Sequence, residues 1–181
     1  WTRARCRRSP TSTSATADDR GAVPGWRIRR AVPADAPAIW AVHTRAIRET
    51  ASPHYPPESV AAWSGRMTPG SYVEPIETRV VLIAEDDDGR VAGFAQLNPR
   101  EGVVQACYVD PDFNGRGVGR ALMAAIEDEA REHGRTALLL DASLNAVAFY
   151  ASLGWREEAR AHHELAPGAW LDCAIMTKTI T

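Results

Sequence analysis

The residues best suited to chemistry lie in one glycine-rich segment that follows an apolar stretch. Gly115, Gly117 and Gly119 alternate with larger residues just before a helical pattern begins. Glycines let backbone N–H groups approach a ligand without interference from side chains, and the first turn of a helix leaves unpaired donors and a positive dipole end. The segment from Tyr108 to Leu122 therefore predicts a site for an anionic group such as a phosphate.

The spacing of these glycines excludes two common phosphate-binding loops. A dinucleotide fingerprint, Gly-x-Gly-x-x-Gly, would need its third glycine where the chain has Arg120 or Leu122. A P-loop would need a Gly-Lys-Ser/Thr step, and Lys178 is the only lysine of the chain. The anion is therefore expected to be held by another kind of glycine turn.

A second motif, about 30 residues further along, indicates which kind of turn this is. The two motifs read Asn114-Gly115-Arg116-Gly117-Val118-Gly119 and Asn145-Ala146-Val147-Ala148-Phe149-Tyr150, the second continuing to Gly154 and Trp155. In this order they resemble the acyl-CoA-binding signature of the GCN5-related N-acetyltransferase (GNAT) superfamily, with Asn114 where the family usually has Gln or Arg. The resemblance extends from about Trp26 to Thr179.

The resemblance implies acetyl-CoA as the acyl donor, with its pyrophosphate on the glycine turn and its pantetheine arm along the preceding strand. The cofactor-binding residues that it implies are Tyr108, Val109, Asn114, Gly115, Arg116, Gly117, Val118, Gly119, Arg120, Asn145 and Tyr150. Backbone N–H groups would do most of the binding, and the two arginines would add charge-assisted hydrogen bonds to phosphate. Asn145 would contact the CoA arm, although its place at the start of a helix also suits a cap.

The reaction that the resemblance implies is direct transfer of the acetyl group to a primary amine of a small molecule, peptide or protein. Tyr150 would donate a proton to the departing thiolate and the Val109 N–H would stabilise the oxyanion, while packing in the core is the other interpretation of Tyr150. Tyr55 and Trp63 either wall an acceptor pocket or pack in the core. Transfer of a longer acyl group and a non-catalytic acyl-CoA sensor are the alternative functions.

The sequence leaves the general base open. The family often carries a carboxylate in the strand before the glycine turn, but this chain has Gln105, whose amide cannot accept the proton. The other candidates are Glu101, His54, Tyr55 and Glu58. Glu101 is the nearest of them in sequence to the active strand, and a histidine such as His54 has the intrinsic pKa closest to neutral pH. Cys107 is expected to be a small packing residue, since no histidine lies near it in sequence.

Composition and charge limit the possible partners. The 181 residues are 45% hydrophobic with a net charge of −2, which suits one globular domain and gives no bulk attraction to nucleic acid or anionic membranes. No apolar run approaches the roughly 18 to 20 residues that span a bilayer. The cysteine spacing and the acidic turn at 86–88 match no disulfide framework or metal site, so no metal is expected. We expect a cytoplasmic protein, monomeric or homodimeric.

The chain is expected to divide into a tail, residues 1–24, and one acetyltransferase domain, residues 25–181. The tail carries four arginines before a Ser/Thr/Ala tract, so disorder is predicted, with a transit peptide or an RNA- or lipid-contacting segment as alternatives.

Hydrophobic periodicity predicts the elements that position the site. Strands are expected at 26–31, 79–85, 91–97, 103–109, 137–140, 155–165 and 169–179, and helices at 35–49, 58–67, 118–133 and 145–153. This order predicts an α/β (α+β) fold with a mixed, mostly antiparallel central sheet flanked by helices, as the GNAT resemblance also implies. The strand at 103–109 would deliver the chain directly into the glycine turn.

Overall fold

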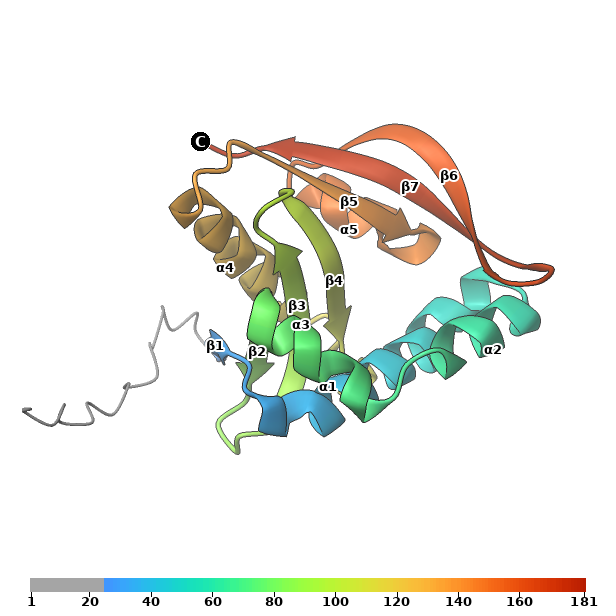
Figure 1. The fold of residues 1–181 in the computed structure, drawn as a ribbon, viewed down its shortest axis with the longest axis horizontal. Helices are drawn as coiled ribbons and strands as arrows, with labels where there is room; N and C mark the ends of the chain where they lie inside the picture. The colour runs from blue at the N-terminus through green and yellow to red at the C-terminus, as the bar shows by residue number, and fades with distance from the viewer. Residues whose placement is uncertain (1–24) are drawn as a thin grey trace, which may run out of the picture.

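The computed structural model describes residues 25–181, which form one mixed sheet with helices on both faces (Figure 1). The strands lie in the order β1-β2-β3-β4-β5-β7-β6, and every neighbouring pair is antiparallel except β4 and β5. Their bounds are β1 Arg27–Arg30, β2 Val80–Glu85, β3 Val91–Asn98, β4 Val103–Val109, β5 Ala137–Ser143, β6 Arg156–Ala166 and β7 Ala169–Thr179. The predicted fold class is confirmed, and the predicted disordered tail lies outside the described residues.

The helices of the fold are α1 Ala36–Arg45, α2 Pro57–Gly65, α3 Val73–Thr78, α4 Val118–Glu132 and α5 Val147–Ser152. α1 and α4 cover the sheet because each buries an apolar stripe against it. On one face α4 buries Leu122 and Ile126 completely, and on the other face Ile39 of α1 packs with Ile83 and Phe94 of the sheet. β2 is buried along its whole length, since helices cover both of its faces.

The sheet opens between β4 and β5. These parallel strands pair only at Val103 and Leu139, where the Leu139 N–H donates to Gly102 O at 3.0 Å, and they diverge from there (Figure 1). A β-bulge lies just beyond this point, because Gln96 of β3 pairs with Ala106 while Leu97 pairs with Val104. The backbone edge of β4 that faces β5 is consequently left without a strand partner.

Several element boundaries differ from the predicted ones. α3 was not predicted, because the Pro69-Gly70 step indicated a break and the helix that follows it is only six residues long. α1 passes into a π-helical segment at Ala46–Ala51 rather than ending near residue 49. β5 continues to Ser143, past the predicted end at Leu140, with its polar residues on a face that helices do not cover.

No helix in the described part of the chain is long and apolar enough to cross a membrane.

Candidate active site

The glycine turn lies between β4 and α4 and has a conformation that needs glycine at two positions. Gly115 and Gly117 have φ angles of 74° and 85°, in the left-handed region that side chains disfavour. A Cβ at either position would meet no described atom within 4 Å, because both residues face open space. α4 begins at the next residue, Val118, so its unpaired N–H groups and positive dipole end lie beside this space.

A cavity of about 490 Å³ lies beside the turn and joins the two sequence motifs. It is lined by Thr50, Cys107, Val109, Phe113, Asn114, Gly115, Gly117, Val118, Gly119, Arg120, Asn145, Ala146, Phe149 and Tyr150. Of the residues predicted to bind CoA, this lining includes all but Tyr108 and Arg116. Tyr108 lies on the opposite side of β4, with its ring 4.0 Å from that of His43, and the Arg116 guanidinium lies 5.5 Å above the Phe113 ring.

Gly119 is required for a different reason than its two neighbours. It lies within α4, and a Cβ there would lie 3.0 Å from Cζ of Phe149, a residue of α5. The absence of a side chain therefore lets α5 pack closely against the start of α4. This contact holds the second motif against the first.

An ion-pair network fixes the chain just before the glycine turn. The buried Asp110 carboxylate accepts the Asp112 N–H at 3.0 Å and two hydrogen bonds from Arg45 Nη1 at 2.8 and 2.7 Å. Hydrogen bonds from Arg45 and Arg90 lower the pKa of Asp112 to about 2. α1, the residue before β3 and the segment that leads into the glycine turn are thereby tied together.

Two hydrogen-bonding groups lie beside the cavity, the side-chain amide oxygen of Asn145 and the backbone N–H of Val109. Asn145 Oδ1 is buried and has no hydrogen-bond partner among the described residues. Asp110 donates its N–H to Ala92 O of the neighbouring β3 at 2.9 Å, and backbone groups alternate between the two edges of a strand. The N–H of Val109, one residue earlier, therefore points toward the gap between β4 and β5.

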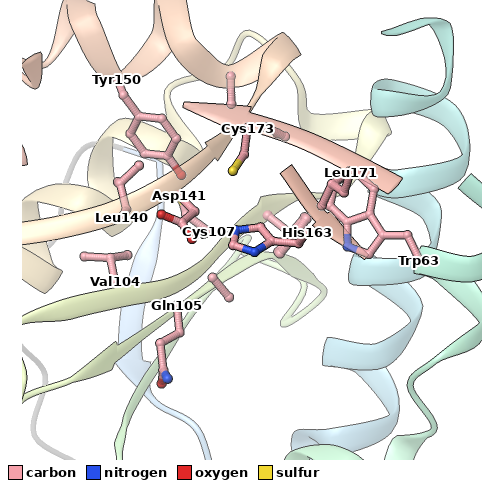
Figure 2. A pocket seen from close by; sticks show the side chains of 14 residues that line it. Trp63, Val104, Gln105, Cys107, Leu140, Asp141, Tyr150, His163, Leu171 and Cys173 are labelled. Atoms are coloured by element: carbon pink, nitrogen blue, oxygen red, sulfur yellow. Dashed lines mark hydrogen bonds and ion pairs between the residues drawn. The ribbon is translucent and has the colours of Figure 1, made fainter. Parts of the chain in front are cut away.

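A second, smaller cavity of about 190 Å³ lies in that gap (Figure 2). It is lined by Trp63, Val104, Gln105, Ala106, Cys107, Tyr108, Leu140, Asp141, Ser143, Ala146, Tyr150, His163, Leu171 and Cys173. Trp63 thus lines this cavity. Three residues, Cys107, Ala146 and Tyr150, line both cavities, so the two spaces meet there.

Tyr150 and Cys107 stand at this junction in neutral form. Burial raises the pKa of the Tyr150 phenol well above its usual value, and the nearby Cys107 thiol contributes in the same direction. Burial raises the pKa of Cys107 to about 12, so at neutral pH it is a thiol and no nucleophile. The junction therefore offers a proton donor in Tyr150 and a small packing residue in Cys107.

The smaller cavity also holds a polar pair that sequence reasoning missed. His163 Nε2 of β6 lies 3.0 Å from Asp141 Oδ2 of β5. The Cys173 Sγ of β7 lies within 4.8 Å of a ring nitrogen of His163 and a carboxylate oxygen of Asp141. Figure 2 shows Asp141 and His163 between Tyr150 and Trp63. No motif joins these residues in the sequence, and only the pairing of β5, β6 and β7 brings them together.

The geometry of two adjoining cavities, one of them at a glycine turn, agrees with a family model. Residues 51–165 match the model described as an acetyltransferase (GNAT) domain, which is more than half of the chain. The chain belongs to the GNAT superfamily. The predicted family and activity class, an acetyl-CoA-dependent N-acetyltransferase, are thereby confirmed.

Two relatives of this GNAT protein cover most of its length. It is 28% identical over 144 residues to the uncharacterized N-acetyltransferase YafP of Escherichia coli, covering 80% of this chain and 89% of the relative. It is 33% identical over 128 residues to the ribosomal protein bS18-alanine N-acetyltransferase of Salmonella typhimurium, covering 68% of this chain and 76% of the relative.

Solved structures agree with this. A GCN5-related N-acetyltransferase from Rhodopseudomonas palustris has a TM-score of 0.79 and 30% identity, covering 88% of this chain and 98% of that one. The putative acetyltransferase YncA of Salmonella typhimurium, solved with acetyl-CoA, has a TM-score of 0.66 and 26% identity, covering 87% and 95%.

The structure of this GNAT protein brings none of the candidate bases Glu101, His54, Tyr55 and Glu58 into either cavity lining. Glu101 lies in the turn between β3 and β4, where it accepts a hydrogen bond from Asn98 Nδ2 at 2.7 Å. His54 lies exposed in a short 3-10 turn before α2. Gln105 accepts hydrogen bonds from Arg79 and Gln96. Proximity in sequence to the active strand was therefore a poor guide to position.

Tyr55, another candidate base, serves the framework. Its hydroxyl donates to Asp172 O at 2.8 Å and accepts the Leu144 N–H at 2.7 Å. It thereby ties the segment before α2 to β7 and to the start of the second motif.

Proposed function

We propose that this chain transfers an acetyl group directly from acetyl-CoA to a compact primary amine. The donor occupies the larger cavity and the acceptor enters the smaller one. The observation that carries this proposal is the meeting of the two cavities at Cys107, Ala146 and Tyr150. Because the smaller cavity measures about 190 Å³, a small amine or one exposed amino terminus suits it better than a bulky acceptor.

The residues of the larger cavity fit CoA. The left-handed turn at Gly115 and Gly117 and the start of α4 offer backbone N–H groups to a pyrophosphate, and Arg120 adds positive charge at the rim. The unpaired edge of β4 and the unpaired Asn145 Oδ1 suit the amide groups of a pantetheine arm. CoA carries both a pyrophosphate and the amide groups of its pantetheine arm, so the cavity offers partners to each.

The chain's own groups assist transfer at the junction. Acetyl-CoA supplies the activated acyl group. The Val109 N–H points into the gap, where it can donate to the carbonyl oxygen as negative charge develops. Tyr150, neutral and buried, is placed to donate its phenolic proton to the thiolate that leaves.

The acceptor side has the character of a cation site. Trp63 and Tyr108 provide aromatic walls and Asp141 provides a carboxylate, which together favour a protonated amine. An alkylammonium with a pKa of about 10.4 must lose its proton before attack, at a cost of about 4.6 kcal/mol at pH 7. An α-amine near pKa 8 needs only about 1 kcal/mol.

The test is thiol release from acetyl-CoA across a panel of alkylamines, amino acids, aminoglycosides and peptides. We expect turnover with at least one small primary amine. Tyr150→Phe is expected to lower kcat about 100-fold or more, because it removes the proton donor, while leaving the Kd for CoA within about threefold.

Tyr72→Phe is the matched control, since it removes a buried hydroxyl outside both cavities. Tight CoA binding without turnover on any amine would instead favour the sensor function. An unchanged kcat in Tyr150→Phe would refute the role given to that phenol.

A further inference from the structure

The acceptor cavity contains a side-chain pair whose geometry is that of an oriented base. Asp141 projects from β5 and His163 from β6, and both line the cavity that ends at Tyr150 (Figure 2). The His163 Nε2 to Asp141 Oδ2 distance is 3.0 Å, within the range of a hydrogen bond. Both side chains are about half exposed, at 51% and 43%, so a proton taken up there can leave to solvent.

The hydrogen bond determines which imidazole nitrogen carries the hydrogen. A neutral imidazole has one N–H and one lone pair, whereas an ionised carboxylate only accepts. Nε2 of His163 therefore carries the hydrogen that it donates to Asp141, and Nδ1 carries the lone pair. A proton accepted at Nδ1 gives an imidazolium whose charge the carboxylate stabilises, as in other His–carboxylate pairs.

The rest of the acceptor cavity offers no competing group that suits this task. Gln105 is an amide, and Cys173 is a largely buried thiol whose pKa burial raises. Glu101 and His54 lie outside both cavity linings. We propose that His163 is the general base that deprotonates the acceptor amine, with Asp141 as the residue that positions it; this inference rests on the proposed function.

The transfer conserves both protons and electron pairs. The acceptor, R–NH3⁺, gives one proton to Nδ1 of His163, and the freed nitrogen lone pair forms the C–N bond to the acyl carbon. The C–S bond breaks, and the leaving sulfur takes the phenolic proton of Tyr150. The remaining surplus proton on the new amide nitrogen returns to the Tyr150 phenolate. The products are the acetamide and CoA thiol, and His163 releases one proton to solvent.

The experiment compares two acceptors of different basicity. The most active alkylamine of the panel is protonated at pH 7, whereas an arylamine or hydrazide analogue of it is largely neutral and needs no base. We expect His163→Gln to lower kcat/KM about 100-fold or more for the alkylamine, but less than about fivefold for the neutral analogue. Added imidazole is expected to restore part of the activity of His163→Gly with the alkylamine.

His162→Gln is the matched control, because His162 is the residue just before His163 in β6 and its side chain lies on the other face of the strand. Its ring centroid lies 5.4 Å from that of Trp170. It should leave both acceptors within about twofold of wild type. Asp141→Asn should also lower kcat/KM more for the alkylamine than for the neutral analogue. The loss should be smaller than in His163→Gln, since the imidazole remains.

Three other results would overturn the role proposed for His163, each on a different ground. If wild type is active and His163→Gln loses equally with both acceptors, or loses nothing, His163 is not the base. If chelation abolishes wild-type activity and Zn²⁺ restores it, a metal ion at these side chains replaces the proton-transfer role and the inference falls. If wild type acetylates no amine at all, the proposed function fails, and this inference fails with it.

Discussion

At the scale of single residues, Asn145 is expected to lower the stability of the protein without ligand and to strengthen its binding of CoA. Asn145 lines the larger cavity, and its buried Oδ1 lacks a partner among the described residues. A buried acceptor left unpaired destabilises the folded state by about 1–3 kcal/mol, and a ligand N–H would remove that penalty. A hydrogen bond from CoA to this oxygen would therefore contribute to the free energy of CoA binding.

Replacement of Asn145 by leucine tests this. The side chains have similar shape, so we expect the free energy of unfolding without ligand to stay equal or rise by up to about 1 kcal/mol. The Kd for CoA should rise about three- to tenfold, because one hydrogen bond is lost. Urea denaturation and calorimetry measure the two effects. A fall in both stability and affinity would indicate a structural cap instead.

His43 on α1 makes stability depend on pH. Burial lowers its pKa to about 4, and its Nδ1 lies 2.6 Å from the Tyr72 hydroxyl. The unfolded chain, with a histidine pKa of about 6.5, binds a proton that the folded protein refuses between these values. Stability is therefore fully present above about pH 6.5 and falls toward pH 4, by about 3 kcal/mol in total.

The measurement is denaturant unfolding of wild type and His43→Phe between pH 4 and 7. The variant should lose less stability over this interval, because it has no imidazole to protonate. Equal slopes for the two proteins would mean that other groups cause the acid dependence. The Asp112 carboxylate, with its lowered pKa of about 2, contributes stability that is lost only below about pH 4, so it does not interfere.

At the scale of elements, the contact between α4 and α5 explains why two motifs far apart in sequence occur together. Phe149 packs where Gly119 has no side chain, so the glycine turn and Asn145 are placed by the same contact. Gly119→Ala should therefore act through Phe149 rather than through phosphate binding alone. Overpacking at such a contact destabilises by about 1–3 kcal/mol.

A double-mutant cycle measures this coupling. Gly119→Ala is expected to lower both stability and CoA affinity, and adding Phe149→Leu, which makes room for the new methyl group, should recover part of each loss. Gly117→Ala provides the comparison, since its penalty comes from a φ of 85° and not from Phe149. Additive effects of Gly119→Ala and Phe149→Leu would contradict the proposed contact.

The elements also explain how far the sequence could predict the site. The turn at 115–119 and the run at 145–150 are local patterns. Their residue types and spacing were therefore sufficient to predict nine of the residues that line the larger cavity. The pair of Asp141 and His163 depends on the registers of β5, β6 and β7, which no local pattern reveals. A shift of one residue in β6 would present His162 in place of His163.

At the scale of the whole molecule, the sheet is continuous only through the short contact between β4 and β5. The Val109 N–H and its neighbours on the β4 edge have no strand partner beyond that contact. If a pantetheine arm pairs with this edge, CoA should protect the amides of β4 from hydrogen exchange as well as those at the start of α4.

Hydrogen exchange with and without saturating CoA measures this protection. We expect slower exchange in peptides covering 103–109 and 115–120, and little change in the β6–β7 hairpin turn, which lies away from the larger cavity. Protection confined to the start of α4 would show that CoA is held by its phosphates alone. Gly119→Ala should weaken both signals together at a fixed CoA concentration.

The opening between β4 and β5 has a consequence for the lifetime of the protein. A pantetheine arm that pairs with the free edge of β4 would extend the sheet for as long as CoA is bound. A ligand at a free concentration of 100 times its Kd stabilises the folded state by about 2.7 kcal/mol. The protein should thus resist proteolysis and thermal unfolding better with acetyl-CoA bound than without it. Scarcity of acetyl-CoA would then shorten the survival of the enzyme as well as slow its reaction.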